Sequence, residues 1–487
     1  MPTILGANSI SGYEISNSLR FNKGDNPQLN LANVGTVTND KKFTYSVWLK
    51  RGIVDEGNNY SILSAVSGNN KAQILFRGGS SNAIRFIETA NNFTSTDSIL
   101  TTAALFRDPS AWYHIVVAYD STDGTAANRV KIYANGVLQT LSGTTVNENY
   151  TTPFNEASYN LDVGHFDGSS GEVYDGYMSE ANFIDGQQLA PTAFGETDDN
   201  GEWIPIRYTG SYGNNGFFLE FKQTGTSTDA SGMGADTSGN GRHFAPTNLA
   251  AIDVTTDTPT NNFCTFNPLP LTTGSVVLSE GNTVITADGA ANYSGQHGTI
   301  GVSNGKWYWE MKALDSSVVM IGALTLNTSP RGDNTSDSSG NGMYYYYANT
   351  HYQSNETTIR RSNAGNGSLG NSAVSGGSNS VSNLSDNDIV QIALDMDNNK
   401  IYFGLNGTFV NSSNPANGTN SFTLHTDVSN PVSPYVGADA GQVAANFGQP
   451  SFAISSGNAD ADGHGNFEFA VPSGYFALCS KNLAEYG

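Results

Sequence analysis

The sequence contains few charged residues and almost no cysteine. Of 487 residues, 14% are Asp, Glu, Lys or Arg, against about 25% in an average soluble protein. Only 22 are basic and 44 are acidic, which gives a net charge of −22. The basic patch that phosphate binding requires is missing, so we expect no nucleic-acid partner. The two cysteines, Cys264 and Cys479, are too few for a disulfide framework and are expected to be buried thiols.

Long apolar runs are missing as well. No segment approaches the ~20 apolar residues of a membrane span. Residues 1–16 lack the basic and then apolar pattern of a signal peptide. We therefore expect neither secretion by this route nor insertion into a membrane.

Turn-forming residues take the place of the missing charge, and Gly alone occurs 54 times. Between the turns lie short segments that alternate apolar and polar residues, such as FTYSVWLKRG (43–52) and AIRFIET (83–89). This alternation is typical of strands with one buried face, and no long stretch has helical periodicity. The sequence therefore predicts an all-β fold made of antiparallel sandwiches.

One sequence pattern, Lys-Ile-Tyr followed closely by Asn-Gly, occurs twice and is called the repeated phrase below. KIYANGVLQT (131–140) follows the apolar run HIVVAYD (114–120), and KIYFGLNGTF (400–409) follows IVQIALD (389–395). Asn-Gly between β-prone runs predicts a two-residue hairpin, because both residues tolerate positive φ. Each copy therefore predicts an antiparallel meander, and the repeat favours two domains of related architecture.

The chain is divided by a segment rich in Gly and Pro. We predict a β-sandwich over 1–196, a connector over 197–270 and a second β-sandwich over 271–487. Aromatic residues such as Trp203 and Phe217 occur within the connector, which indicates that it is ordered and packs against a domain.

Each half resembles a known domain family. SLRFN (18–22) and WYHIVVAYD (112–120) resemble a laminin-G-like, concanavalin A-like domain. GKWYWEMKA (305–313) and DIVQIALDMDNNKIYFGLNG (388–407) resemble a SPRY domain. The resemblance implies two concanavalin-like antiparallel β-sandwiches, or jelly rolls, joined by the loop-rich connector. Two related sandwiches that need the same hairpin would account for the repeated phrase.

The combination of segments also resembles structural proteins of tailed bacteriophages, common among marine phages. NFIDGQQLAPTAFGETDDNGEWIP (182–205), DTPTNNFCTFNPL (257–269) and FALCSKNL (476–483) carry this resemblance, which covers nearly the whole chain. It implies a tail-fibre or spike-type virion protein, exposed on the particle surface and commonly homotrimeric. Its partners would be other virion proteins and a host-surface glycan or protein. The alternatives are a capsid decoration or head-fibre protein and, third, a polysaccharide depolymerase.

The acidic residues do not form the pattern of a glycosidase. Glucanases place two carboxylates on one face of a strand, flanking the sugar. The nearest match, Glu196, Asp198 and Glu202 in ETDDNGE, has the wrong spacing and is interrupted by Asn-Gly. We therefore predict a non-catalytic protein.

Two kinds of binding site are predicted. Calcium prefers several oxygen ligands that converge from a loop, and Asp-rich turns occur in DSTDG and NADADGHGN. Sugars stack on aromatic rings, and the strand MYYYYAN precedes polar loops. The predicted metal ligands are Asp120, Asp123, Asp460 and Asp462, with Ca2+ as the single candidate cofactor, and the predicted ligand-binding residues are Tyr345, Tyr347, His351 and Tyr352.

Overall fold

The fold comes from a computed structural model, which forms two compact units, Ser9–Thr260 and Asn261–Gly487. We call them the N-terminal and C-terminal units. The structure describes residues 12–32, 35–54, 57–90, 95–157, 159–166, 171–269, 276–288, 294–326, 343–349, 358–361, 384–424 and 430–487.

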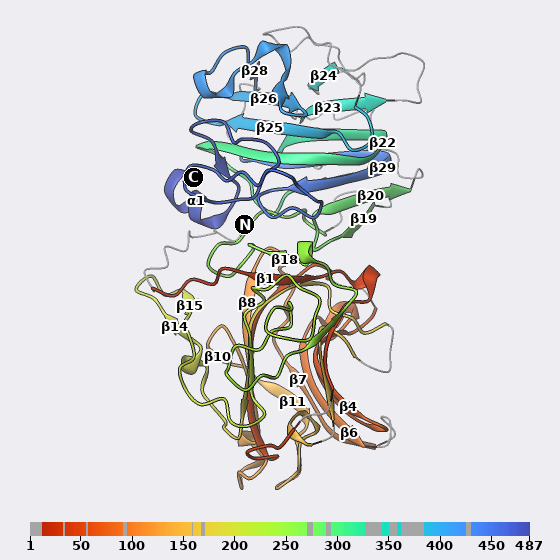
Figure 1. The fold of residues 1–487 in the computed structure, drawn as a ribbon, viewed down its shortest axis with the longest axis vertical. Coiled ribbons are helices and arrows are strands. Elements are labelled where there is room, and N and C mark those ends of the chain that lie inside the picture. The colour runs from red at the N-terminus through yellow and green to blue at the C-terminus, as the bar shows by residue number, and fades with distance from the viewer. Residues whose placement is uncertain are drawn as a thin grey trace. The chain divides into compact units, whose positions relative to one another are not determined.

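The N-terminal unit is a sandwich of two antiparallel sheets, whose strands are curved (Figure 1). Sheet A has the order β10-β9-β8-β3-β13-β1-β18, with β16 also paired to β13. Its strands are β1 (Ser18–Phe21), β3 (Lys42–Arg51), β8 (Trp112–Asp120), β9 (Val130–Ala134), β10 (Val137–Leu138), β13 (Gly176–Asp185), β16 (Phe217–Leu219) and β18 (Val254–Thr255).

Sheet B has the order β11-β7-β6-β5-β4-β12-β2-β17. Its strands are β2 (Gln28–Leu31), β4 (Tyr60–Ser67), β5 (Asn70–Phe76), β6 (Ile84–Ala90), β7 (Ser95–Thr102), β11 (Leu141–Thr144), β12 (Asn160–Val163) and β17 (Ala245–Thr247).

The core of this unit lies between the two sheets. Alternate residues of β3, such as Phe43 and Tyr45, pack against sheet B residues such as Ile74 and Phe86, and all four are fully buried. Aromatic rings dominate this core, and Phe43 stacks on Phe183 with ring centroids 5.3 Å apart. Side chains that enter the core therefore alternate along the strand with the same period of two residues as the apolar pattern in the sequence.

Most residues that we assigned to the connector belong to the N-terminal unit. Phe217, Phe221 and Phe244 are buried in its core, and β16 adds to sheet A beside β13. A small hairpin, β14 (Gly195–Thr197) with β15 (Trp203–Pro205), precedes them. Residues 261–269 lie in the other unit.

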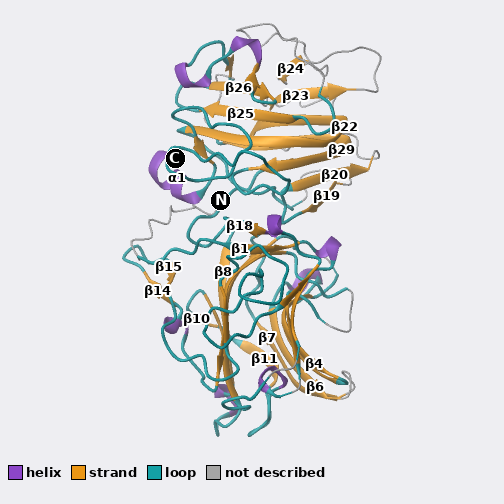
Figure 2. Ribbon diagram, in the orientation of Figure 1, coloured by secondary structure: helices purple, strands orange, loops and turns teal. Residues whose placement is uncertain are grey.

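The C-terminal unit is built on a twelve-stranded sheet within the described residues (Figure 2), in which β30 pairs parallel to β22 and the other pairs are antiparallel. Its main path is β19-β20-β29-β22-β25-β26-β27. The strands are β19 (Val276–Ser279), β20 (Val284–Asp288), β21 (Ser294–His297), β22 (Lys306–Thr325), β23 (Met343–Asn349), β24 (Thr358–Arg361), β25 (Ile389–Asp395), β26 (Lys400–Leu405), β27 (Thr408–Phe409), β28 (Phe422–Thr423), β29 (Val432–Asn446) and β30 (Phe476–Ala477).

The described helices are short. The single α-helix among them, α1 (Ser480–Tyr486), lies near the C-terminus, and none is long and apolar enough to cross a membrane. The 3₁₀ helices are Lys23–Asp25, Gly79–Ser81, Ala126–Asn128, Pro153–Asn155, Pro191–Ala193, Ala251–Asp253, Val410–Ser412 and Pro415–Asn417.

The two units share one meander, as the repeated phrase predicts. β9-β8-β3-β13 in one has the same neighbour order as β26-β25-β22-β29 in the other. Asn135 and Asn406 both adopt positive φ, 47° and 48°. The side chain of each accepts a backbone N–H from the neighbouring strand of its meander, β8 or β25. Positive φ at these turns is the conformation that an Asn-Gly hairpin requires.

The aromatic strand β22 alternates between two cores. Trp307 and Trp309 are buried in the larger core of the C-terminal unit, and Tyr308 is buried in a second core under the chain's last segment. Glu310 points to the same side as Tyr308 and is fully buried. The prediction of an all-β fold with concanavalin-like sandwiches is confirmed.

Candidate functional site

A row of four polar side chains crosses sheet B. Gln73 on β5 lies opposite Ser64 on β4, Ser64 opposite Asp162 on β12, and Asp162 opposite Asn30 on β2. Residues directly opposite one another in a sheet project from the same face. We call these four residues the polar row.

The polar row faces away from the core. The neighbouring row, in which Leu161 lies opposite both Ala65 and Leu31, is part of the buried core between the sheets. Since adjacent residues in a strand point to opposite faces, the polar row projects from the outer face of sheet B. Within it, Asn30 Nδ2 donates to Asp162 Oδ1 over 2.7 Å.

His165 and Glu172, which follow β12, both contact residues of this face. Ser64 Oγ donates to the carbonyl of His165 over 3.0 Å. At the far end of the same segment, Glu172 accepts hydrogen bonds from Gln73 Nε2 at 2.8 Å and from Asn59 Nδ2 at 3.1 Å. The Glu172 carboxylate therefore joins the polar row to the loop before β4.

The accessible part of the site carries hydrogen-bonding groups. Gln73, Ser64 and Asp162 are buried, whereas Asn30, Asn59 and Glu172 are half-buried and reach solvent. Amides offer donors and acceptors side by side, and a carboxylate offers acceptors. Such a set can exchange its hydrogen bonds with water for bonds to the hydroxyls of a sugar or to a peptide backbone.

We compared the chain with known families and structures. Residues 23–190 match the model of the concanavalin A-like lectin/glucanases superfamily, and residues 306–450 match that of the SPRY domain. The chain contains a concanavalin-like domain and a SPRY domain. The search of curated proteins gave no match.

Several solved structures resemble parts of the chain at 16% identity. A native heptameric SAP-like pentraxin from Limulus polyphemus matches 37% of this chain and 80% of its own, with a TM-score of 0.27. The SPRY domain of human HERC1 matches 37% and 96%, with a TM-score of 0.25. Domain 4 of AbnA, a GH43 extracellular arabinanase from Geobacillus stearothermophilus in complex with arabinotriose, matches 34% and 68%, with a TM-score of 0.25. These values are too low to assign an activity.

The two predicted calcium ligands of the concanavalin-like domain have other partners. Asp120 forms an ion pair with Lys42 at 2.9 Å and accepts from the backbone and hydroxyl of Thr122. Burial by itself would raise the pKa of Asp120. The hydrogen bonds from Thr122 and Lys42 outweigh burial and lower this pKa below its ordinary value. Asp123 accepts from the backbone N–H of Thr125 over 2.7 Å. A calcium ion here would have to replace donors that already hold the turn.

The predicted ligands in the C-terminal unit, which contains the SPRY domain and is called the SPRY half below, form a structural turn. Asp460 Oδ1 accepts from the backbone of Asp462 and His464, and its Oδ2 accepts from Ala477 N and Asn482 Nδ2, all within 3.0 Å. Within the described ranges, no group of three or more His, Cys, Asp or Glu side chains is placed to hold a metal ion. Calcium binding stays a prediction.

The predicted aromatic site falls on β23 and the chain beyond it. Tyr345 lies opposite Gly322 of β22 and Arg360 of β24 in the pairing of the strands. Tyr347 is two residues further along the same strand. The other two predicted residues, His351 and Tyr352, lie outside the described residues. This site also stays a prediction.

The carboxylates of ETDDNGE shape a hairpin. Asp198 Oδ1 accepts from the backbone of Asn200 and Glu202, at 2.9 and 2.8 Å, and so closes the turn between β14 and β15. Glu196 is exposed on β14. This arrangement has the geometry of a turn cap.

An unusual carboxyl group lies on the other sheet of the concanavalin-like domain. Glu180 adopts φ of 51° at a bulge in β13 and is 8% exposed. Its carboxylate accepts from the hydroxyl of Tyr13 over 2.6 Å. Burial raises the pKa of Glu180 to about 7, and the charge of Glu220 adds to this, against the opposing effects of Tyr13 and Arg207. Positive φ in a non-glycine residue stores strain, which concentrates at functional sites.

A buried histidine on sheet A has a structural role. His114 Nδ1 accepts from Trp203 Nε1 at 2.9 Å, and its Nε2 lies 2.8 Å from Ser46 Oγ. Because an indole N–H can only donate, Nε2 carries the proton and donates to Ser46. Burial lowers the pKa of His114 to about 3. The ring is therefore neutral and serves to attach the segment that carries Trp203.

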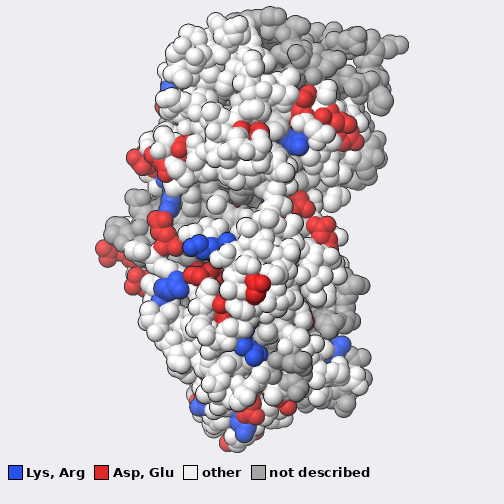
Figure 3. All heavy atoms as spheres, in the orientation of Figure 1, with Lys and Arg blue, Asp and Glu red and all other residues white. Residues whose placement is uncertain are grey.

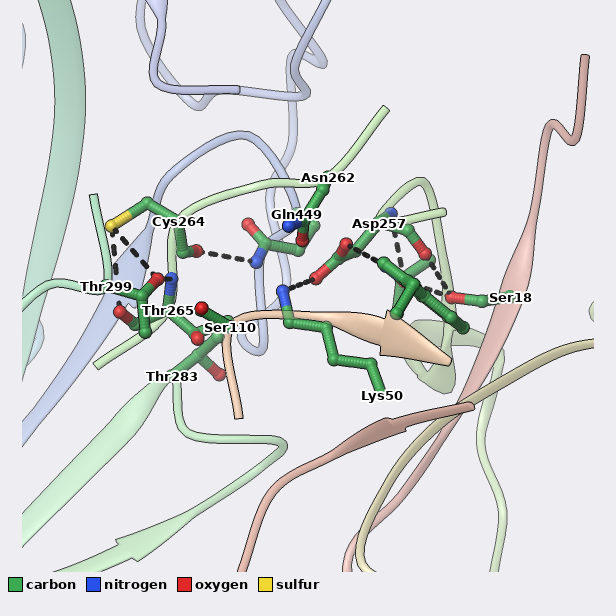
Figure 4. A network of polar contacts seen from close by, with 12 residues as sticks. Ser18, Lys50, Ser110, Asp257, Asn262, Cys264, Thr265, Thr283, Thr299 and Gln449 are labelled. Carbon is green, nitrogen blue, oxygen red and sulfur yellow. Dashed lines mark hydrogen bonds and ion pairs between the residues drawn. The ribbon is translucent and has the colours of Figure 1, made fainter. Parts of the chain in front are cut away.

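Figure 4 shows buried polar pairs in each domain. In the concanavalin-like domain, Lys50 Nζ points to Asp257 Oδ2 at 2.7 Å, and both side chains are at most 1% exposed. Ser18 Oγ donates to the carbonyl of Asp257. The pair therefore fixes the segment that follows β18.

In the SPRY half, Thr299 Oγ1 lies 3.9 Å from the sulfur of Cys264, and Gln449 Nε2 donates to the Cys264 carbonyl. Cys264 and Cys479 are both buried thiols, as predicted. Burial raises the pKa of the Cys479 thiol to about 12. Their role is therefore packing.

Sequence reasoning missed the polar row because its members come from four separate strands. Each polar residue sits at an outward position of its strand, for example Gln73 between the buried Ala72 and Ile74. That alternation is a usable signal for the face of each strand. The register that aligns the four residues is a property of the folded sheet.

Proposed function

We propose that the chain is a non-catalytic binding protein of a bacteriophage particle, which attaches to host-surface glycans through the polar row and Glu172. Three features support this: the lectin-type and SPRY domain matches, the phage-like segments of the sequence, and the polar row itself. The polar row is the observation that carries the proposal. It places amide, hydroxyl and carboxylate groups in register across one face of a curved sheet.

The charge distribution supports a neutral ligand. The face of the molecule in Figure 3 is largely uncharged, with scattered acidic groups and few basic ones. A polyanionic ligand would be repelled by the net charge of −22. Hydroxyl-rich glycans need hydrogen bonds and no basic patch.

The test is binding to an array of bacterial surface polysaccharides, followed by titration of the polysaccharide that binds best. Glu172→Ala removes the acceptor that orders Asn59 and Gln73. We expect it to weaken binding about tenfold, because a charge-assisted hydrogen bond contributes ~1.5–3 kcal/mol and solvent at the site compensates part of it.

Glu196→Ala is the matched control, because Glu196 is an exposed glutamate on the same domain and away from sheet B. It should leave binding unchanged. Release of reducing sugar by the wild-type protein would refute the non-catalytic assignment and favour a depolymerase. Equal binding by both variants would refute the site.

The virion location is tested separately by a reconstruction of the particle. Density for this chain at the tail supports attachment to the host, as proposed. Density over the capsid lattice would favour the alternative of a decoration or head-fibre protein.

A further inference from the structure

The two sheets of the concanavalin-like domain share one continuous edge segment. β10 is the edge strand of sheet A and β11 is the edge strand of sheet B, and only Gln139 and Thr140 separate them. Gln139 N donates to Ile132 O in sheet A, while the carbonyl of Thr140 accepts from Ala103 N beside sheet B. Residues 137–144 therefore present the edges of both sheets on one side of the sandwich.

This edge is apolar and exposed. Val137 is 64% exposed and Leu138 is 55% exposed. Leu105, 47% exposed, lies in the segment joined to the edge by the bond between Ala103 and Thr140. Large apolar side chains that gather at one exposed place indicate an interaction surface.

The edge strands are short, with two residues in β10 and four in β11, but they carry none of the side chains that usually prevent strand pairing. Exposed edges are usually protected by charged side chains, by proline or by a covering segment. Residues 137–145, VLQTLSGTT, contain no charge and no proline. The opposite edge of sheet B, in contrast, is β17 and includes Pro246.

The SPRY half has a further short strand beside the equivalent hairpin. Its repeated hairpin also ends in a two-residue strand, β27, paired to β26. There the chain returns, and Phe422 and Thr423 of β28 pair with β26 as well. Phe422 is fully buried. Within the described residues, both domains therefore place the last strand of this hairpin, β10 or β27, at the end of a sheet.

We propose that residues 137–144 pair with the same residues of a second copy of this chain, antiparallel about a two-fold axis. An antiparallel pairing of one strand with itself places donors opposite acceptors, and a two-fold interface requires a patch of this self-complementary kind. Charge favours this surface as well. Two chains of net charge −22 repel one another, so they approach most closely through a strip without charge.

The test uses the full chain in sedimentation velocity over a range of protein concentrations and salt concentrations. We expect a monomer–dimer equilibrium that shifts toward dimer as salt rises, because salt screens the repulsion between the copies. Leu138→Glu introduces a charge into the uncharged strip of each copy, where pairing would remove that charge from water, and should yield monomer at every concentration tested.

Val277→Glu is the matched control, since Val277 is 64% exposed and lies on an edge strand of the SPRY half. It should dimerise as the wild type does. Both variants should keep the wild-type melting temperature, because both positions are exposed. Hydrogen exchange supplies an independent readout: amides of residues 137–144 should gain protection as the protein concentration rises.

Three results would overturn the proposal. One is a wild-type monomer at all concentrations. Another is a dimer or trimer that Leu138→Glu leaves intact. The third is an edge that gains protection only with an added extended peptide, which would show that its occupant is a different partner.

Discussion

Replacing Glu310 by glutamine should destabilise the SPRY domain. Glu310 is fully buried. One carboxylate oxygen accepts from Tyr308 OH and Phe469 N, each at 2.8 Å, and the other accepts from Glu468 N at 2.9 Å and Asn446 Nδ2 at 3.3 Å. The side chain therefore attaches the last segment of the chain to β22.

The magnitude follows from the donors that lose an acceptor. Glutamine has the same shape, but one of its two terminal atoms is an N–H2 group that donates. At least one backbone N–H, of Glu468 or of Phe469, then faces another donor. A buried donor without an acceptor costs about 1–3 kcal/mol. We expect Glu310→Gln to lower the free energy of unfolding of this domain by that amount.

The measurement is hydrogen exchange at increasing urea, read on peptides from Lys306–Thr325 so that only the SPRY domain is followed. Glu485→Gln is the control, because Glu485 is exposed on α1 and its replacement should change stability by less than about 0.5 kcal/mol. If Glu310→Gln also changed stability by less than this, the hydrogen bonds of Glu310 would not hold the last segment.

The effect should depend on pH with a definite sign. Burial raises the pKa of Glu310 above its ordinary value of 4.5, against the hydrogen bonds it accepts. Because the pKa of Glu310 is higher in the folded than in the unfolded protein, the stabilising contribution of this carboxyl group is fully present below pH 4.5. It is lost as pH rises through the pKa that Glu310 has in the folded protein. The stability difference between wild type and Glu310→Gln should therefore shrink as pH rises. A difference that grew with pH would contradict this reasoning.

Three further predictions concern the concanavalin-like domain. Since burial raises the pKa of Glu180 from 4.5 to about 7, melting temperatures should fall as pH rises across that interval, and Glu180→Gln should abolish this part of the dependence. Asp257→Asn leaves Lys50 charged and buried, and should cost about 3–5 kcal/mol in chemical denaturation, whereas a surface pair costs under about 1 kcal/mol. Gly136→Ala should cost about 1–3 kcal/mol in the same assay, because φ is 78° and the new methyl group would lie 2.5 Å from the ring of Trp203; wild-type stability would refute the close packing.

The sequence by itself determined the fold class and the repeated meander. Alternation at Trp307, Tyr308 and Trp309 is enough to assign the two faces of β22, because the period of a strand is fixed by its backbone. The positive φ at Asn135 and Asn406 also follows from local chemistry. These features depend on neighbours in the chain, so they can be predicted without the rest of the molecule.

Only the tertiary structure decided which side chains meet. The polar row joins Asn30 to Asp162 across more than a hundred residues, and a shift of one residue in the pairing would turn either side chain into the core. The predicted turn carboxylates Asp120 and Asp460 were recognisable as turn residues, but the fold brings Lys42 to Asp120 and the N–H of Ala477 to Asp460. Register is set by the whole pattern of burial, and for that reason the candidate site could not be predicted from sequence alone.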